Sequence, residues 1–355
     1  MPGPDANAKP ADPASRAWLT LVTRSSYLPG VVLLIHTLYK HNSKHALIVQ
    51  YTSSLEADCI DCLKDLTAIY PLLRIQHVDP VPLPKRLKPI SGRFDDTLTK
   101  LRIFQPLDDS EQPTVPKLER APERVCFLDA DIAIFRNLDD IFDIPLPSSD
   151  WIAAHHTCIC NIDGDPWAPP EWNPQNCPTS AVSHPEALDA NIPSSSKDGA
   201  KPTDQLMNSG VFVCTPSHEL WRRIDDFRLN SPLVENFTFP DQNFLDEFFR
   251  DHWVPIGWQY NAFKTHRYWH ANAWRDNEVR ALHYIVDKPW EARVKADGTA
   301  GYRGRDGVTH SWWWKEYEDW QEEMASNEQK GKAVLDCVEK YVCVDSGLGK
   351  TNFES

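Results

Sequence analysis

Residues Arg124 to Phe142 read RVCFLDADIAIFRNLDDIF. The apolar run Val125 to Leu128 predicts a short buried strand, and Asp129 and Asp131 follow it directly. Side chains two residues apart in an extended chain point to the same side, so both carboxylates face one place. Mg²⁺ and Mn²⁺ prefer carboxylate oxygens combined with the phosphate oxygens of a substrate. The stretch therefore predicts a metal site for a phosphate-containing ligand; the competing interpretation is a strand-ending turn with solvated acids.

The segments before this stretch alternate between strand patterns and helix patterns. In chain order, we predict a strand, a helix, a strand, a helix and a strand at Ala17 to Thr23, Tyr27 to Tyr39, Ala46 to Tyr51, Leu55 to Tyr70 and Leu73 to Val78. This alternation is typical of an α/β protein with a mainly parallel sheet. Ligands of such sheets bind beyond the carboxyl ends of the strands, which is where the two carboxylates stand.

The composition is that of a globular protein with an acidic surface. With 355 residues, of which 41% are hydrophobic, the chain can bury a full core. Its net charge of -14 argues against nucleic acid or an anionic membrane surface as the main partner. No run of about 18 apolar residues occurs, so we expect no membrane span.

Residues 1–16 are rich in proline and alanine and lack the apolar core of a signal peptide. We therefore expect a disordered N-terminal tail. Without an export signal, the nine cysteines are interpreted as reduced thiols and the location as cytoplasmic.

Residues 150–204 are predicted to form an irregular insertion, because Pro, Ser and Trp are frequent there. A loop of this length is either functional or disordered. It contains three cysteines and two histidines: Cys158, Cys160, Cys177, His155 and His156. Two interpretations stay open, a zinc site and thiols buried in a lid.

A histidine and a lysine near the end of the chain can complete the metal site. The predicted strand Val279 to Tyr284 contains His283 at its end, and Lys288 follows shortly after. Histidine is a good ligand for Mn²⁺, and lysine is a good partner for phosphate. This segment is therefore expected to meet the strand that ends at Asp129.

Two further polar positions each have two interpretations. Lys100, in the predicted helix Asp95 to Leu107, stands where it can face phosphate or sugar, whereas the alternative is a solvated helix lysine. Asp241 opens the predicted helix Asp241 to Phe249, where an acid is commonly a cap.

Taken in order, these motifs resemble those of the retaining glycosyltransferases of family 8, the group that includes glycogenin and galactinol synthase. The resemblance covers roughly Ala17 to Trp290, and its pieces are AWLTLVT with Tyr27, TLTK, FLDAD with NLDDIF, MNSGVFV, DQNFLDEFF and HY…KPW. It implies a GT-A fold, with a mainly parallel central sheet, helices on both faces and one catalytic domain at residues 17–320. Residues 321–355 are then a C-terminal helix and tail.

The resemblance also implies a UDP-sugar donor, Mn²⁺ with Mg²⁺ as an alternative, and transfer with retained anomeric configuration. Residue by residue, it makes Asp129, Asp131 and His283 the metal ligands. The other implied site residues are Leu21, Thr23 and Tyr27 at the uridine, Lys100, Asn208 and Ser209 at the donor sugar, Asp241 and Gln242 beside the anomeric carbon, and Lys288 at the diphosphate. A metal and a lysine would neutralise the charge that develops on the leaving UDP.

The acceptor is expected to be a small polyol or sugar, since the cysteine-containing insertion is absent from glycogenin and resembles one in galactinol synthases. Tyr268 lies at the offset of the tyrosine that glycogenin glycosylates on itself, but the surrounding KTHRYWHANAW is crowded with bulky and cationic groups. A self-glycosylating primer and a sugar-nucleotide-binding protein without catalysis are the alternatives. Homodimer formation stays open.

A phosphatase of the haloacid dehalogenase type is disfavoured, because Ala133 stands where that family needs Thr or Val.

Overall fold

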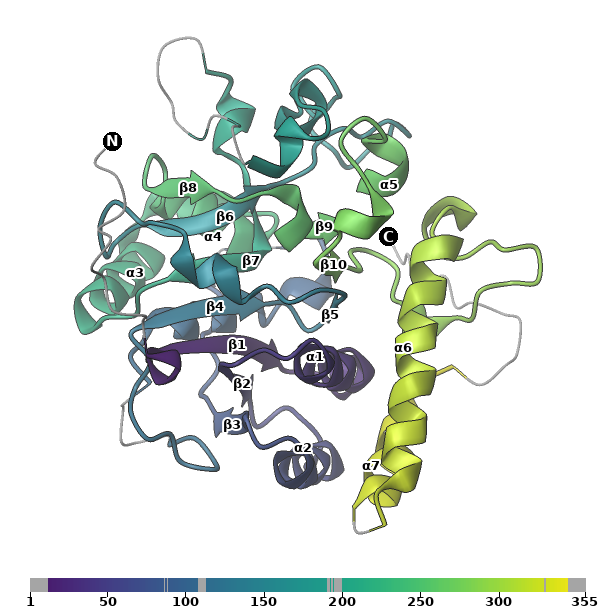
Figure 1. The fold of residues 1–355 in the computed structure, drawn as a ribbon. Helices are drawn as coiled ribbons and strands as arrows, with labels where there is room; N and C mark the ends of the chain where they lie inside the picture. Colours follow the sequence, from purple (N-terminus) through teal and green to yellow (C-terminus); the bar gives the residue numbers. More distant parts are fainter. Residues whose placement is uncertain are drawn as a thin grey trace.

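A seven-stranded central sheet organises the molecule (Figure 1). The computed structural model describes residues 12–343 apart from 86, 88, 108–112, 190, 191, 193, 195–199 and 329. The strand order is β3-β2-β1-β4-β7-β6-β8. The strands are β1 Arg16–Val22, β2 Ala46–Tyr51, β3 Leu73–His77, β4 Arg124–Leu128, β6 Ile152–His156, β7 Met207–Cys214 and β8 Trp253–Pro255. All neighbouring strands pair in parallel except β7, which is antiparallel to both β4 and β6.

A smaller sheet lies against the carboxyl end of β4. Its order is β5-β10-β9, with β10 antiparallel to β5 and parallel to β9. The strands are β5 Ile132–Ile134, β9 Ala262–Phe263 and β10 Ala281–His283. Since β5 begins one residue after Asp131, this sheet brings the end of β10 to the carboxylates.

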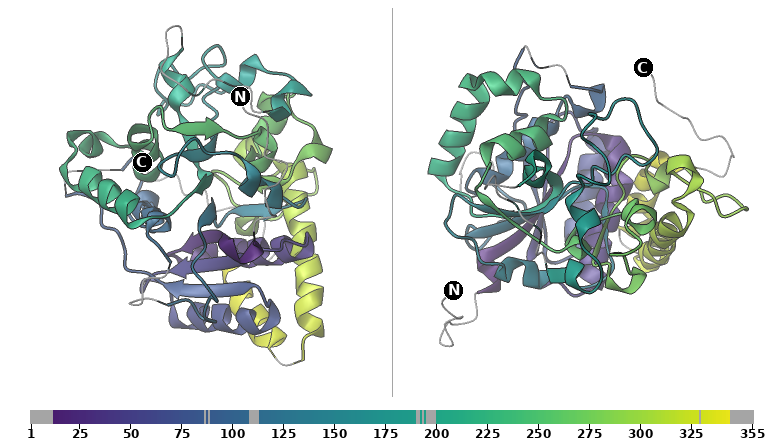
Figure 2. Two further views of the ribbon diagram at one scale, coloured as in Figure 1. Left: turned by 60° about the vertical axis from the view of Figure 1, so that its left-hand side comes forward. Right: turned by 90° about the horizontal axis from the view of Figure 1, so that it is seen from above.

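Helices cover both faces of the central sheet, as predicted (Figures 1 and 2). The helices are α1 Leu28–Lys40, α2 Ala57–Ile69, α3 His218–Asn230, α4 Pro240–Phe248, α5 His266–Trp269, α6 Gly307–Ser326 and α7 Gly331–Val338. One core contains Trp18 and Val22 with residues of α1, α2, α6 and α7. The other contains Ala17 and Leu19 with residues of α3 and α4. Residues of β1 divide between the cores because side chains alternate along a strand.

Strand β6 lies inside the segment predicted as an irregular insertion. Ile152–His156 pair with β7 and β8, and all five residues are buried. The prediction was wrong here because a strand buried on both faces shows no apolar–polar alternation, and alanine has a weak strand preference. The insertion between the two strands is therefore residues 157–206.

The predicted α-helix Asp95 to Leu107 is instead a 3-10 helix, Thr97–Phe104. Its β-branched residues Thr97, Thr99 and Ile103 weaken the preference for an α-helix. It packs against α3 and α4 and carries Lys100 towards the sheet.

The C-terminal helices belong to the domain and are not an appendage. The predicted boundary at residue 320 falls inside α6, where Trp320 is fully buried. Helices α6 and α7 pack against α1 and α2. Residues 1–11 of the predicted tail and residues 344–355 lie outside the described part of the chain, and Pro13–Ser15 form a short 3-10 helix. Among the described helices, none is long and apolar enough to cross a membrane.

Candidate metal and donor site

The three predicted metal ligands meet where β4 and β10 end. His283 Nε2 lies 3.2 Å from Asp131 Oδ1 and 3.7 Å from Asp129 Oδ2. One ligand atom from each of the three side chains lies within 4.8 Å of the others. Backbone hydrogen bonds position the pair of acids, because the Asp129 amide donates to the Gly210 carbonyl and the Tyr284 amide donates to the Asp131 carbonyl.

Helix α1 approaches this turn closely enough to require a glycine. A Cβ atom on Gly30 would lie 2.3 Å from the Ala130 carbonyl oxygen and 2.7 Å from the Trp290 ring. Ala130, the residue between the two acids, therefore lies directly against α1. Trp290 also packs against Gly30, and its indole N–H donates to the Ser26 carbonyl just before the helix.

A chain of amides sets the tautomer of His283. The Gly210 amide donates to Asn208 Oδ1, so this oxygen is an acceptor, and Asn261 Nδ2 donates to it at 2.9 Å. Asn261 must then present Oδ1 to His283 Nδ1, at 3.0 Å, and Nδ1 carries the hydrogen. The Nε2 lone pair therefore faces Asp129 and Asp131, as a metal ligand requires.

Asn261 is a site residue that sequence reasoning missed. It is fully buried, directly before β9, and joins His283 to Asn208, which donates in turn to Gln242 Oε1 at 3.2 Å. An asparagine before a short strand is an ordinary turn residue, so the sequence carries no signal for this role.

Gly210→Ala is expected to weaken Mn²⁺ binding about 10- to 100-fold, the usual cost of disturbing the support of a metal ligand. An added Cβ would lie 2.3 Å from His283 Cε1 and 2.8 Å from Asn208 Oδ1, so the imidazole must move. Calorimetric titration with Mn²⁺ measures the change, with circular dichroism to verify the fold. Gly92→Ala is the matched control, because its nearest neighbour is at 3.6 Å. Equal Mn²⁺ affinity in the two variants would contradict the assignment.

Lys100 is buried and bound to two carboxylates. Its Nζ lies 2.9 Å from Asp129 Oδ1 and 2.6 Å from Asp241 Oδ2, and it donates to the Ser209 carbonyl at 3.1 Å. Ser209 Oγ donates to Asp241 Oδ2 at 2.8 Å. Burial lowers the pKa of Lys100, but Asp129 and Asp241 outweigh it and raise that pKa above its ordinary value. The solvated-lysine alternative is therefore wrong.

Asp241 is likewise no simple helix cap. It is the second residue of α4, and the residue before the helix, Phe239, makes no side-chain cap. Burial raises the pKa of Asp241, but Lys100 and Ser209 outweigh it and hold the pKa below its usual value. The side chain is thus an ionised carboxylate one residue away from Gln242.

Lys288 pairs with the other metal carboxylate. Its ammonium group forms an ion pair with Asp131, donates to the Tyr284 carbonyl at 2.9 Å and lies 5.7 Å from the centre of the Tyr27 ring. Although burial opposes it, the Lys288 ammonium group holds the pKa of Asp131 well below its usual value. Three carboxylates, including Asp241, thus face two ammonium groups. A divalent cation would turn this negative excess into a positive site suited to a diphosphate.

The predicted uridine residues, Leu21, Thr23 and Tyr27, do not form one cluster as the metal ligands do. Thr23 lines a cavity of about 650 Å³, together with Arg24 and Thr99, the neighbour of Lys100. The metal ligands do not line this cavity. Tyr27 packs edge-on against Trp290, and Leu21 is a half-buried residue of β1 that contacts the second core. Arg24 forms an ion pair with Asp96 at 3.2 Å.

Comparisons with known proteins show which sequences this chain is related to. A family model described as glycosyl transferase family 8 matches residues 19–293. Galactinol synthase 1 of Solanum lycopersicum is 25% identical over 312 residues, covering 86% of this chain and 83% of the relative. Galactinol synthase 3 of Arabidopsis thaliana is 27% identical over 314 residues, covering 86% and 81%.

Two solved structures support the fold. The galactosyltransferase LgtC, in complex with donor and acceptor sugar analogues, has a TM-score of 0.51 at 14% identity, covering 85% of this chain and 95% of LgtC. The glycosyltransferase GlyE of Streptococcus pneumoniae has a TM-score of 0.50 at 16% identity, covering 94% and 66%. The predicted GT-A architecture is thereby confirmed. The family match spans most of the chain and includes every residue of the site described above, and the protein belongs to glycosyltransferase family 8.

Proposed function

We propose that this protein is a Mn²⁺-dependent, retaining hexosyltransferase that moves glucose or galactose from a UDP-sugar to a small polyol or sugar. The observation that carries the proposal is the cluster of Asp129, Asp131 and His283 with an ionised lysine on each side. Two carboxylate oxygens and an imidazole nitrogen with a free lone pair form a donor set that fits Mn²⁺, with Mg²⁺ as the alternative. The bound cation would neutralise the charge on the diphosphate.

The chain's own residues have separate tasks in this proposal. Lys288, beside Asp131 and the face of Tyr27, binds the diphosphate and stabilises the leaving UDP. Tyr27, Thr23 and Leu21 contact the uridine.

The residues on the other side of the metal ligands hold the sugar. Lys100, Ser209 and Asn208 orient it, and Asp241 and Gln242 lie beside the anomeric carbon. Because Lys100 binds Asp241 and Ser209 at once, these three side chains form one rigid unit. Rigid, buried partners need no reorganisation when charge develops at the sugar.

The insertion at residues 157–206 is proposed to cover the acceptor side. Its Asp163 and Asp165 bind Arg305 and Arg303 at 2.9 Å each, and Asp165 also accepts from the Tyr302 hydroxyl at 2.7 Å. These contacts tie the insertion to the loop before α6 at one end. An insertion fixed by these contacts would form one wall of the acceptor site, and we propose that this wall limits the site to a small acceptor. The cytoplasmic location, the binding of small molecules in place of nucleic acid or membrane, and the homodimer alternative stay predictions.

A self-glycosylating primer is the second candidate, and the surroundings of Tyr268 argue against it. The hydroxyl donates to Asp306 Oδ1 at 3.3 Å, and the Arg305 guanidinium lies 5.6 Å from the ring centre. Trp269 packs edge-on against Tyr302 in the same region. A tyrosine that must enter an active site would first have to leave these contacts, so transfer to a free acceptor is favoured.

A UDP-release screen tests the proposal. With Mn²⁺ and either UDP-glucose or UDP-galactose, we expect release that increases on addition of myo-inositol or another polyol, and no change in the mass of the protein. A ladder of added hexoses in the intact mass that disappears in Tyr268→Phe would restore the primer alternative. UDP binding without release, with any donor and acceptor, would indicate the binding protein without catalysis.

A further inference from the structure

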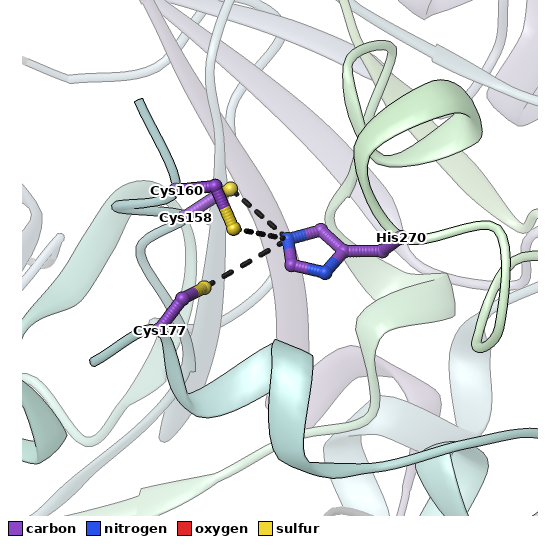
Figure 3. A group of neighbouring side chains, drawn as sticks. All are labelled: Cys158, Cys160, Cys177 and His270. Carbon is purple, nitrogen blue, oxygen red and sulfur yellow. Dashed lines mark hydrogen bonds between the residues drawn. The ribbon is translucent and has the colours of Figure 1, made fainter. Parts of the chain in front are cut away.

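Three thiols and one imidazole nitrogen converge where the insertion begins, and none of them belongs to the residues assigned to the donor (Figure 3). His270 Nε2 lies 3.1 Å from Cys158 Sγ, 3.4 Å from Cys160 Sγ and 3.8 Å from Cys177 Sγ. All four ligand atoms lie within 4.8 Å of one another. Cys158 is half-buried, and the other three residues are buried.

The distances match the edges of a tetrahedral zinc site. With Zn–S bonds of about 2.3 Å and a Zn–N bond of about 2.0 Å, the nitrogen lies about 3.5 Å from each sulfur, and the sulfurs lie about 3.8 Å from one another. Three cysteines and one histidine are a common ligand set of structural zinc. Plain thiol packing does not explain the arrangement, because one imidazole nitrogen can accept a hydrogen from one thiol at a time.

The surroundings suit a closed structural site. Ile159, Trp172, Leu206 and Trp269 pack around the thiols and keep water away. The His270 ring is held edge-on by His266, with ring centres 4.9 Å apart, while its Nδ1 has no hydrogen-bond partner in the described part of the chain.

The two histidines that the sequence placed beside these cysteines are not part of the cluster. His155 Nδ1 bonds the Ile256 carbonyl oxygen at 3.2 Å, and His156 packs against Trp253. The fourth ligand comes instead from His270, which is 93 residues beyond Cys177. Spacing along the chain could not show this, because α5 meets the insertion only in the folded protein.

We propose that Cys158, Cys160, Cys177 and His270 bind one structural Zn²⁺ that joins the insertion to the segment after α5. The cross-link lies between two parts of the donor site. On one side, Cys158 follows β6, whose His156 pairs with Met207, next to Asn208. On the other, His270 follows β9, whose Phe263 pairs with His283. Zinc here would hold these two segments together without touching the reacting atoms.

Metal analysis of the purified full-length protein tests the site. We expect about one zinc per chain in protein washed with a weak chelator. After replacement of zinc by Co²⁺, the visible spectrum should show the intense bands of a tetrahedral thiolate site. X-ray absorption at the zinc edge should show three sulfur ligands and one nitrogen ligand. These measurements on the unaltered chain do not depend on whether a variant folds.

Variants then assign the ligands. Cys158→Ser/Cys177→Ser should lose the zinc and unfold at a lower temperature, whereas the matched control Cys214→Ala, a buried cysteine on β7, should keep it. Asp131→Asn should also keep its zinc, which separates this proposal from the one on the transferase site. A disulfide among the three cysteines, a chain that takes up no zinc when reconstituted, or zinc retained by the double variant would each overturn it.

Discussion

Replacing Asp131 by asparagine is expected to weaken Mn²⁺-dependent binding of UDP by about 100-fold or more, since even the outer partners of metal ligands are worth 10- to 100-fold. The carboxylate supplies one oxygen towards His283 and the other to Lys288. An amide carries no negative charge for the metal or for the ammonium group, so both parts of the diphosphate site are weakened together.

Calorimetric titration with UDP, with and without Mn²⁺, measures this effect. The control is Asp61→Asn, which changes an exposed acid of α2 that pairs with Lys64. Thermal unfolding of both variants shows whether the fold is kept. If Asp131→Asn bound UDP as the unaltered protein does, Asp131 would not be a metal ligand, and the donor site proposed above would have to lie elsewhere.

The second large effect concerns stability. Asp306→Ala is expected to lower the free energy of unfolding by about 3–5 kcal/mol, the usual cost of breaking a buried ion pair by removing one partner. Asp306 Oδ2 lies 2.7 Å from Lys264 Nζ, and both side chains have 0% exposure. Burial lowers the pKa of Lys264 and raises that of Asp306, which disfavours the charged form of each group. The opposite charge of the partner counteracts this effect in both cases.

Asp306 also accepts from the Tyr302 amide at 2.7 Å, just before α6 begins. Its removal therefore leaves a buried ammonium group without its charge partner and frees the start of the longest helix. The double variant Lys264→Met/Asp306→Leu should recover part of the loss, because it removes both charges and keeps the volume.

Urea denaturation measures the three free energies of unfolding. Lys64→Ala/Asp61→Ala, which removes an ion pair with exposed fractions of 55% and 70%, is the control and should cost far less than the loss of the buried pair. A loss of the same small size in Asp306→Ala would show that the buried pair contributes no more than a surface pair.

Local sequence patterns were enough for the fold class and for most of the elements. The strands at residues 17–23, 46–51 and 73–78 and the helix at 27–39 were found to within one residue at each end. The hydrophobic periodicity of these elements reflects which face is buried, and it can be recognised from residues that are close together in the sequence. Prediction failed at β6, where both faces are buried, and at the 3-10 helix that carries Lys100, where β-branched residues weaken the α-helix.

The sequence by itself determined the family and placed Asp129, Asp131, His283, Lys100 and Lys288 as candidates, because each stands in a short motif of adjacent residues. Only the tertiary structure decided the partners of these side chains. Asn261 supports His283 across 22 residues, Lys264 meets Asp306 across 42, and His270 joins Cys158 across 112. A buried polar group must be satisfied by whatever the chain topology brings beside it, and that neighbour leaves no periodic trace in the sequence.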